Sequence, residues 1–392
     1  MKKKAVLLIV PTLAQGGQEK VCLMTADLLC QDQRFDIYIV VFDEKKLFYD
    51  VGELNIINLN LPAKSGLIKK AVQIVRRVNA VKHIKKNKSI ACSYSFGTTA
   101  GIVNVFSKKI FSKKNGKILV GIRGYLSLQN RLQRMFVYPG ADVTVCCSKS
   151  MAEDAKNIYG ITNALPLTNP VNAEDICRKA GQQIVSLKKA DEKIIITAGR
   201  IHKVKGYWHL LKAFSLMKKK YPGARLVHIG EGNPKPYIGL AENLGIGDSV
   251  DFLGVKNNPF PYFKSADLYV LSSLSEGFPN AMLEAMAIGL PVIATDCKSG
   301  PREILHEDIN DPVFKKKGII KADYGILVPV MNNVVNWDAK VFEKEEKYLA
   351  DAILQMFSDE EHLMKYKRKS IERVKKYTTE NYLHELNKLL CD

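Results

Sequence analysis

The sequence lacks the features that define several common classes of protein. None of its eight cysteines forms a C-x-x-C pair, so no zinc-ligand spacing is present. A disulfide framework would be unusual in a chain of 392 residues. No run approaches the roughly 18 apolar residues that a membrane-spanning helix requires. Internal repeats and low-complexity segments are also missing. These absences predict a globular protein with buried, reduced thiols.

The N-terminus lacks the full pattern of a signal peptide. Lysines precede the apolar run Ala5–Val10, but Pro11 breaks this run and no small-residue cleavage site follows it. A first β-strand is therefore the better interpretation, and we expect a cytoplasmic protein.

Acidic residues are scarce in one part of the chain. The 392 residues include 59 Lys and Arg against 40 Asp and Glu, a formal net charge of +19. Residues 51–150 hold 18 of these basic residues and only Glu53 and Asp142 as acids, a net charge of +16. The rest of the chain is nearly balanced. This uneven charge indicates a polyanion or an anionic surface as a partner.

The order of apolar and amphipathic segments predicts an α/β protein of two domains. Short apolar runs alternate with helical patterns such as Glu19–Cys30, Leu67–Ile84, Tyr207–Lys219 and Ala281–Ile288, which is typical of βαβ units with parallel sheets. The expected strands are Ala5–Val10, Asp36–Val41, Ile56–Leu59, Ile90–Tyr94, Ile118–Ile122, Val143–Cys147, Ile194–Ala198, Arg225–Ile229, Val250–Leu253, Leu268–Leu271, Val292–Thr295 and Gly325–Val328.

The pattern breaks at Asn169-Pro-Val-Asn172, and the polar stretch Ala173–Glu192 reads as a connection between domains. We therefore expect a first domain over residues 1–170 and a second over residues 171–375. A C-terminal helix is expected over residues 376–392, packed back on the first domain. Two doubly wound domains predict ligand sites at the carboxyl ends of their strands.

The densest chemical signal is the segment Ser275–Asp296, in which a strand ends, a Gly- and Pro-containing loop follows, and a helix begins near Ala281. Free backbone N–H groups at a helix start suit an oxygen-rich ligand. Glu276 on the loop and Glu284 on the helix are carboxylates that could each accept hydrogen bonds from a vicinal diol. The alternative is that Glu276 is a solvated loop charge and Glu284 complements the helix dipole.

A second signal follows the strand Ile194–Ala198. A glycine turn carries Arg200 and Lys205, and two fixed cations there would neutralise a diphosphate. Solvated loop charges are the alternative. Gly230-Glu-Gly232 is a weak fragment of a dinucleotide fingerprint. Gly16-Gly17 joins the first strand to the first helix and would let the backbone approach a phosphate, or would simply make a tight turn.

Together these motifs resemble the family-four retaining glycosyltransferases, also described as glycosyl transferases group 1. The resemblance implies the GT-B fold, in which two Rossmann-like doubly wound domains face each other across a cleft. The motifs that carry it are Gly16-Gly17, Asn169-Pro-Val-Asn172, Gly199-Arg200 with Lys205-Gly206, Gly230-Glu-Gly232, Glu276-Gly-Phe-Pro-Asn280 with Glu284, and Thr295-Asp-Cys-Lys-Ser-Gly-Pro-Arg-Glu303.

The resemblance implies a nucleotide-sugar donor, with Arg200 and Lys205 on the diphosphate, Glu276 on the sugar and Glu284 on the ribose. Arg200, Lys205 and Glu276 would carry the catalysis. No metal is expected, since the sequence has no D-x-D carboxylate pair and the two cations supply positive charge. The implied donor contacts are Gly16, Gly17, Arg200, Lys205, Gly230, Val255, Glu276, Gly277, Phe278, Pro279, Asn280 and Glu284.

The acceptor side is less defined. Many relatives carry a histidine near the fourth or fifth strand, whereas the stretch Ala91–Gly97 has none. A front-face mechanism, in which the leaving phosphate takes the acceptor proton, needs no such base. Arg123, after a strand, and Ser95 are the candidate acceptor contacts.

Residues 64–117 combine apolar and basic residues in a pattern that suits anionic lipid headgroups. The alternative is that the apolar stripe packs on the sheet and the lysines are only solvated. Nucleic acid is not expected, because no recognised motif is present and residues 64–117 have few aromatic side chains to stack on bases.

The sequence thus predicts a retaining transferase that moves a hexose or N-acetylhexosamine to a lipid-linked or growing surface-polysaccharide acceptor such as capsule or O-antigen. The expected donor is a UDP-sugar. It would lie at the inner face of the plasma membrane. A UDP-sugar epimerase on the same fold and a non-catalytic nucleotide-sugar-binding scaffold are the alternatives.

Overall fold

The computed structural model describes residues 3–43, 48–108, 116–187 and 192–391. The chain forms two compact units. The first comprises residues 1–170 and 379–392, and the second comprises residues 171–378. The chain therefore crosses between the units after Pro170 and returns after Thr378, whereas the sequence places these boundaries after residues 170 and 375.

A seven-stranded parallel sheet forms the centre of the first unit, in the order β3-β2-β1-β4-β5-β6-β7. The strand order reverses between β1 and β4, which is the doubly wound arrangement. The strands are β1 (Lys4–Val10), β2 (Phe35–Val41), β3 (Ile56–Asn58), β4 (Cys92–Phe96), β5 (Lys117–Ile122), β6 (Val143–Cys146) and β7 (Ala164–Pro166).

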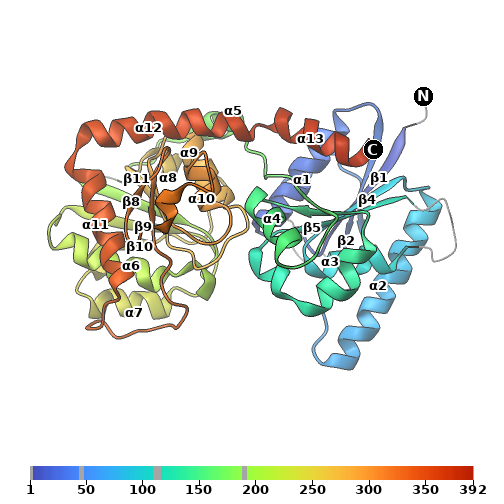
Figure 1. The fold of residues 1–392 in the computed structure, drawn as a ribbon, viewed down its shortest axis with the longest axis horizontal. Coiled ribbons are helices and arrows are strands. Elements are labelled where there is room, and N and C mark those ends of the chain that lie inside the picture. Colours follow the sequence, from blue (N-terminus) through green and yellow to red (C-terminus); the bar gives the residue numbers. More distant parts are fainter. Residues whose placement is uncertain (1–2, 44–47, 109–115, 188–191, 392) are drawn as a thin grey trace. The chain divides into compact units, whose positions relative to one another are not determined.

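Helices cover both faces of this sheet (Figure 1). Alternation along β1 explains why, because successive side chains point to opposite faces. Leu8 belongs to a core that also contains residues of α1 and α13, whereas Leu7 belongs to one that contains residues of α2 and α3. The helices of the first unit are α1 (Gly17–Cys30), α2 (Leu67–Asn87), α3 (Thr98–Phe106), α4 (Lys149–Asn157) and α13 (Thr379–Cys391).

The second unit has its own seven-stranded sheet, in the order β10-β9-β8-β11-β12-β14-β13. Its pairings are parallel except for β13 with β14, which is antiparallel. The strands are β8 (Lys193–Ala198), β9 (Ala224–Ile229), β10 (Val250–Phe252), β11 (Leu268–Leu271), β12 (Val292–Thr295), β13 (Ile320–Lys321) and β14 (Ile326–Val328).

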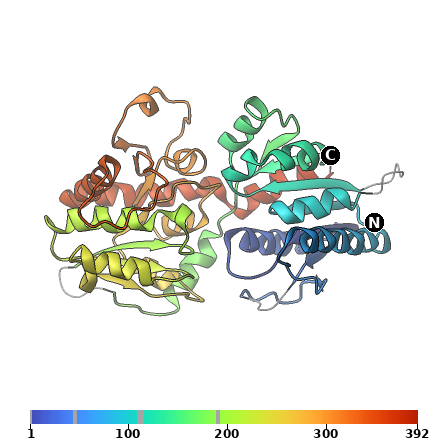
Figure 2. The same cartoon turned by 90° about the horizontal axis from the view of Figure 1, so that it is seen from below.

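Helices α6, α7 and α11 share one large core with inward-facing residues of this sheet, among them Ile195 and Val270. Helix α9 packs against β11 and β12, and α8 lies beside α9. The segment between α10 and β13, orange in Figure 2, projects from the body of the second unit. The helices of this unit are α5 (Ala173–Gly181), α6 (Tyr207–Lys218), α7 (Lys235–Asn243), α8 (Phe260–Lys264), α9 (Asn280–Ala287), α10 (Pro301–Leu305), α11 (Lys344–Ser358) and α12 (Glu360–Val374).

The structure corrects the interpretation of residues 173–192 as a polar connection. Their first half is the helix α5, which Asn172 caps by accepting a hydrogen bond from the Asp175 N–H at 3.0 Å. Ile176 and Ala180 are buried, and the helix packs on α8 and α9. Residues 188–191 lie outside the described residues.

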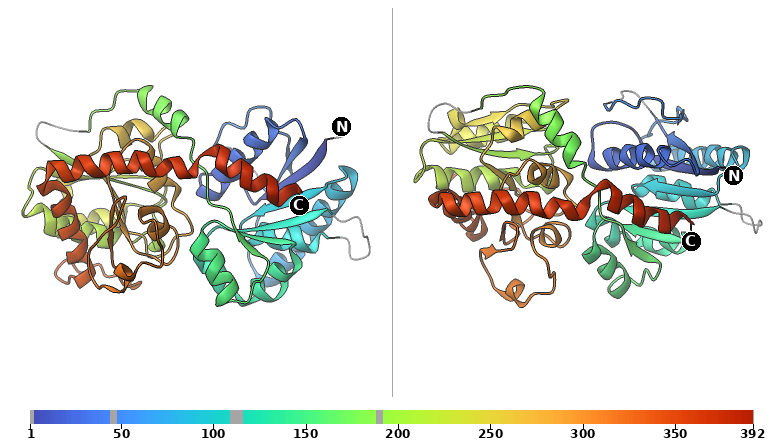
Figure 3. Two further views of the ribbon diagram at one scale, coloured as in Figure 1. Left: turned by 45° about the horizontal axis from the view of Figure 1, so that its top comes forward. Right: turned by 90° about the horizontal axis from the view of Figure 1, so that it is seen from above.

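The C-terminal helix α13 belongs to the first unit, and Figure 3 shows the chain running into it from α12. Tyr382, Leu386 and Leu390 enter the core of the first unit. The Tyr382 hydroxyl also lies 2.7 Å from Thr25 Oγ1 on α1. The last helix of the sequence is thus anchored to the first.

Candidate functional site

The glycine turns of the second unit meet at the carboxyl ends of its strands. Backbone hydrogen bonds tie them together, because the Gly199 N–H donates to Ile229 O (2.9 Å) and the Ile201 N–H donates to Glu231 O (2.6 Å). The Gly230 N–H donates to Gly254 O (3.0 Å) and links the next turn. In open α/β sheets this edge is where ligands bind.

Two of these glycines are required by close packing of the backbone. A Cβ atom at Gly230 would lie 2.0 Å from Gly199 O, and one at Gly206 would lie 2.3 Å from Ser272 O. Gly206 also has a φ of 61°, which favours glycine. Glycine is therefore required at position 230 because this turn packs against the turn at Gly199, whether or not a ligand also approaches it.

The two charged residues predicted on separate loops, Lys205 and Glu276, form an ion pair. The Lys205 Nζ donates to Glu276 Oε1 at 2.6 Å, and the Ser273 hydroxyl donates to the same oxygen at 2.5 Å. Glu276 Oε2 has no hydrogen-bond partner in the part of the chain that the structure describes. The Glu276 side chain is 11% exposed and that of Lys205 24%, so the pair borders on solvent.

Arg200 lies at the end of β8, on the same loop as Lys205, and is exposed. Its side chain makes no hydrogen bond or ion pair with any other described residue. The loop therefore offers an unpaired guanidinium, which is suited to bidentate binding of phosphate oxygens.

Ser299 fixes the loop that follows Glu276. Its hydroxyl lies 2.8 Å from Glu276 O and 3.1 Å from Gly277 O, and donates to these carbonyls. The next residue, Phe278, is buried, so its side chain is withdrawn from solvent. Pro279 is buried as well, and α9 begins at Asn280.

The remaining predicted donor residues lie on elements near the same edge. Glu284 is half-buried on α9. Val255 is exposed and follows β10, next to Gly254, whose carbonyl accepts the hydrogen bond from Gly230. The sequence predicts contacts of Glu284 with the ribose and of Val255 with the base, and both stay predictions.

His228 forms a hydrogen bond with the glycine turn that follows β8. Its Nε2 lies 3.0 Å from Gly199 O and carries the ring proton that this hydrogen bond needs. Burial lowers the pKa of His228 to about 4, so the ring is neutral at pH 7. The carbonyl of Gly199 therefore accepts a hydrogen bond from an uncharged imidazole.

In the first unit, Gly16 precedes the first residue of α1 and has an extended φ of 179°. Its N–H donates to the Tyr49 hydroxyl at 3.2 Å, and that hydroxyl lies 3.0 Å from Gly16 O. A Cβ at Gly16 would lie 2.1 Å from Glu19 Oε2, so side chains crowd this turn. Gly17 opens the helix.

Arg123 follows β5 and is held by neutral groups. Its Nη1 donates to Asn169 Oδ1 (2.8 Å), its Nη2 donates to the Tyr94 hydroxyl (2.5 Å), and its guanidinium lies over the Phe96 ring. The Nε atom is buried and has no partner among the described residues. Arg123 thus joins the sheet of the first unit to the residue that precedes the crossing.

The prediction that Ser95 contacts the acceptor is wrong. Ser95 is fully buried in β4, and its hydroxyl donates to Leu119 O (3.2 Å) and accepts from Asn104 Nδ2 (3.3 Å). Both faces of this central strand are covered, so its serines lie in the core.

Sequence reasoning missed Ser273, which donates to Glu276, and gave no role to Ser299 of the Thr295–Glu303 motif, which fixes the loop of Glu276. Both are fully buried hydroxyls whose partners come from loop geometry. Ser273 lies three residues before Glu276, and that spacing is the only signal the sequence offers.

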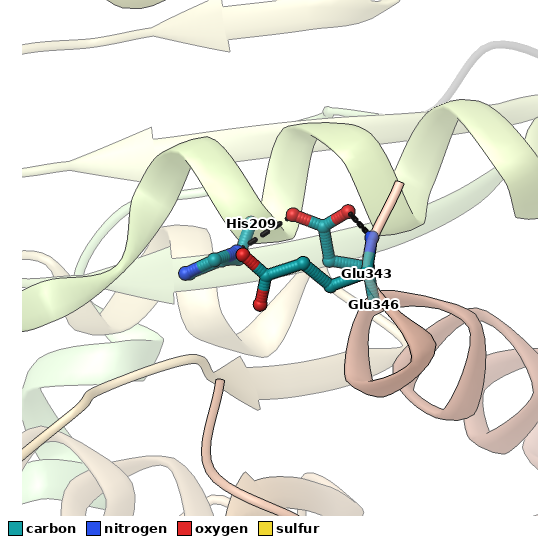
Figure 4. Close-up of side chains that lie close together, drawn as sticks. All are labelled: His209, Glu343 and Glu346. Atoms are coloured by element: carbon teal, nitrogen blue, oxygen red, sulfur yellow. Dashed lines mark hydrogen bonds and ion pairs between the residues drawn. The ribbon is translucent and has the colours of Figure 1, made fainter. Parts of the chain in front are cut away.

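A second cluster joins His209, Glu343 and Glu346, and it is the one group with the spacing of metal ligands among the described residues (Figure 4). Hydrogen bonds explain why these three side chains lie close together. His209 Nδ1 lies 2.6 Å from Glu346 Oε1, and Nε2 lies 3.0 Å from Asn332 O. Glu343 and Glu346 form the capping box of α11. The cluster therefore joins α6 to the start of α11.

The eight cysteines are free thiols, and the prediction that they are buried is correct for five of them. It is wrong for Cys30, Cys177 and Cys391, which are exposed. Burial raises the pKa of Cys297, beside the candidate site, well above its usual range, so this thiol stays protonated and unreactive.

Comparison with known proteins adds the class. Residues 180–322 match the family model of glycosyl transferases group 1. An uncharacterized glycosyltransferase of Methanocaldococcus jannaschii is 28% identical over 395 residues, covering 92% of this chain and 93% of the relative. The N-acetylgalactosamine-N,N'-diacetylbacillosaminyl-diphospho-undecaprenol 4-alpha-N-acetylgalactosaminyltransferase of Campylobacter jejuni is 24% identical and covers 94% of each chain.

Among solved structures, Anabaena HepE in complex with UDP and glucose has a TM-score of 0.73 and 16% sequence identity, with 98% of each chain covered. The chain has the GT-B fold, and the segment that matches glycosyl transferases group 1, residues 180–322, lies within its second unit. The matched segment and the named relatives support a glycosyltransferase.

Proposed function

We propose that this glycosyltransferase retains anomeric configuration and transfers a hexose or N-acetylhexosamine from a UDP-sugar to a lipid-linked or growing surface-polysaccharide acceptor. The UDP in the HepE structure supports the choice of nucleotide. The diphospho-undecaprenol in the name of the Campylobacter jejuni relative supports a lipid-linked acceptor. The family-four assignment made from the sequence is part of this proposal.

The arrangement of Glu276, Lys205 and Arg200 carries the proposal. Lys205 has three N–H donors, and Glu276 uses one of them. The others, together with the unpaired Arg200, are free to bind the donor diphosphate. Glu276 Oε2 is free to accept a hydrogen bond from a sugar hydroxyl, while Oε1 keeps the carboxylate in place.

The neighbouring residues complete the donor site in this proposal. The backbone of the donor-sugar loop, defined as residues 276–280, binds the sugar at the start of α9. Glu284 binds the ribose, and Val255 flanks the base. Gly16, Gly17 and Arg123 are the proposed contacts on the first unit.

The proposed chemistry is a front-face displacement. The bond from the anomeric carbon to the diphosphate oxygen breaks, and the acceptor hydroxyl oxygen bonds to that carbon on the same face. The acceptor proton passes to the leaving diphosphate. Arg200 and Lys205 stabilise the negative charge that develops on this leaving group, so we propose that no metal ion is needed.

Residues 64–117, which combine basic and apolar side chains, are proposed to bring the enzyme to an anionic membrane. Among the described residues, no helix combines the length and apolar character needed to cross a bilayer. Leu67 is 87% exposed and Ile68 81%, beside exposed Lys69 and Lys70 at the start of α2. Apolar side chains at the start of α2 are therefore exposed to solvent. Phe106, at the end of α3, is also exposed. Residues 109–115 of the proposed surface lie outside the described residues.

A thermal-shift screen against UDP-, GDP- and ADP-sugars tests the donor class. We expect UDP-sugars to raise the melting temperature, and the product formed with a suitable acceptor to keep the donor's anomeric configuration by NMR. A shift with GDP- or ADP-sugars alone would contradict the UDP assignment. An inverted product would contradict the retaining mechanism.

A further inference from the structure

Tyr377 lies where the chain leaves the second unit, and its ring packs on the donor-sugar loop. The ring centroids of Tyr377 and Phe278 are 5.3 Å apart, with an interplanar angle of 69°, an edge-to-face contact. Both side chains are buried. Phe278 is therefore fixed by a residue from the far end of this unit's sequence.

Tyr377 is itself held on several sides. Its hydroxyl donates to Glu303 O at 3.1 Å, and the guanidinium of Arg373 lies over its ring at 5.6 Å. Its backbone carbonyl accepts from the Val171 N–H at 2.7 Å. This last bond joins the segment that leaves the second unit to the segment that enters it.

The entering segment is anchored on both sides of Pro170. Asn169 accepts a hydrogen bond from Arg123 of the first unit, and Val171 donates to Tyr377. The two crossing segments are therefore tied to each other at Tyr377, one residue from the boundary at Thr378. The same residue contacts the loop to which we assign the donor sugar.

We infer that Tyr377 is a positioning residue that couples the donor-sugar loop to the chain crossing; the inference rests on the proposed function. Binding of the sugar orders the backbone of residues 276–280, Phe278 transmits that order to the Tyr377 ring, and the Tyr377 carbonyl holds the Val171 N–H. Because such coupling is reciprocal, loosening Tyr377 weakens sugar binding without removing any group that touches the ligand.

Tyr377→Leu tests this inference, with Tyr377→Phe as the conservative variant. Phenylalanine keeps the ring contact, and Glu303 O keeps its hydrogen bond from Arg373 Nη2 at 2.7 Å. Tyr366→Leu is the matched control, because Tyr366 is equally buried in this unit and bonds a backbone carbonyl, Ala322 O, at 3.1 Å. Among the described residues, Tyr366 makes no hydrogen bond or ring contact with residues 276–280.

The first readout is the ratio of dissociation constants for UDP-sugar and UDP, using UDP-glucose and UDP-N-acetylglucosamine as probes. For the UDP-sugar that the wild type binds, we expect Tyr377→Leu to raise the dissociation constant by about fivefold or more. The dissociation constant for UDP should stay within about twofold of the wild-type value. The Phe variant and the Tyr366→Leu control keep the wild-type ratio. An unchanged ratio in Tyr377→Leu would overturn the inference.

The second readout is hydrogen exchange at the Val171 amide. We expect UDP-sugar to slow this exchange in the wild type and in Tyr377→Phe, and to leave it unchanged in Tyr377→Leu. If the sugar slows exchange equally in all variants, Tyr377 does not couple the two segments. If the wild type binds UDP but neither UDP-sugar, the proposed function fails first and the inference fails with it.

Discussion

Lys205 Nζ lies 2.6 Å from Glu276 Oε1, although 71 residues separate them in sequence. The two loops that carry them are joined by further bonds, since the Leu274 N–H donates to Val204 O at 2.7 Å and the Ser272 hydroxyl donates to Lys205 O at 2.9 Å. The cation proposed for the diphosphate and the carboxylate proposed for the sugar are thus positioned by one another.

Lys205→Ala should weaken UDP binding. The variant removes one of the two cations proposed for the diphosphate, and a charge-assisted hydrogen bond contributes about 1.5–3 kcal/mol. We expect the dissociation constant for UDP, measured by calorimetry, to rise by about tenfold or more. Lys203→Ala is the control, because Lys203 is an exposed lysine on the same turn. Equal effects of both substitutions would show only a general loss of charge.

Gly230→Ala should destabilise the second unit. The new Cβ would meet Gly199 O at 2.0 Å, which forces the two turns apart, and overpacking of this kind costs about 1–3 kcal/mol. The control is Gly239→Ala in α7, where a Cβ meets nothing within 4 Å and helix propensity predicts a gain of about 0.5–1 kcal/mol. Urea unfolding monitored by circular dichroism measures both. A Gly230→Ala protein as stable as the wild type would contradict the close packing of these turns.

The free energy of unfolding should fall as the pH drops from about 6.5 to about 4. Burial lowers the pKa of His228 to about 4 in the folded chain, against 6.5 for an ordinary histidine. The unfolded chain therefore binds more protons in this range, and the stabilisation, fully present above pH 6.5, is lost as the pH falls. In His228→Gln, whose amide can still donate to Gly199 O, we expect a flatter pH profile. If the free energy of unfolding changes equally with pH in the wild type and the variant, a group other than His228 causes the change.

Binding to anionic vesicles should depend on the start of α2. Ile68→Ser removes a side chain that is 81% exposed, and we expect its partition onto phosphatidylglycerol vesicles to fall by about fivefold. Ile184→Ser is the control, because Ile184 is 97% exposed on the second unit. Flotation at low and high salt measures the binding. Equal binding to neutral phosphatidylcholine vesicles, or binding to neither, would contradict the membrane proposal.

Much of the fold could be predicted because most strands are apolar runs bounded by glycine or polar residues. Leu268–Leu271 and Val292–Thr295 have the predicted bounds, and most of the others differ by one or two residues. The edge strands β7 and β13 were not predicted, because two of the three residues of β7 are exposed and β13 has only two residues. The charged helix α5 reads as a connection because only a narrow stripe of it is buried.

The candidate site was predicted less completely. The sequence identifies Glu276, Lys205 and Arg200 by their places at strand ends, and the structure brings Glu276 and Lys205 together. It does not reveal Ser273 or Tyr377, whose roles depend on how loops distant in sequence pack. Ser95 was misassigned because its position in a strand with both faces covered leaves no exposed side.

The central claim is that Glu276 holds the donor sugar during reaction. Hydrolysis of the bound UDP-sugar without acceptor, followed as UDP release, measures it directly in Glu276→Ala and Glu276→Gln. The control is Glu242→Ala, an exposed carboxylate on α7. We predict that kcat/KM falls by about 100-fold in both Glu276 variants and stays at the wild-type value in the control. Undiminished UDP release by the Glu276 variants would contradict the role of Glu276 in holding the donor sugar.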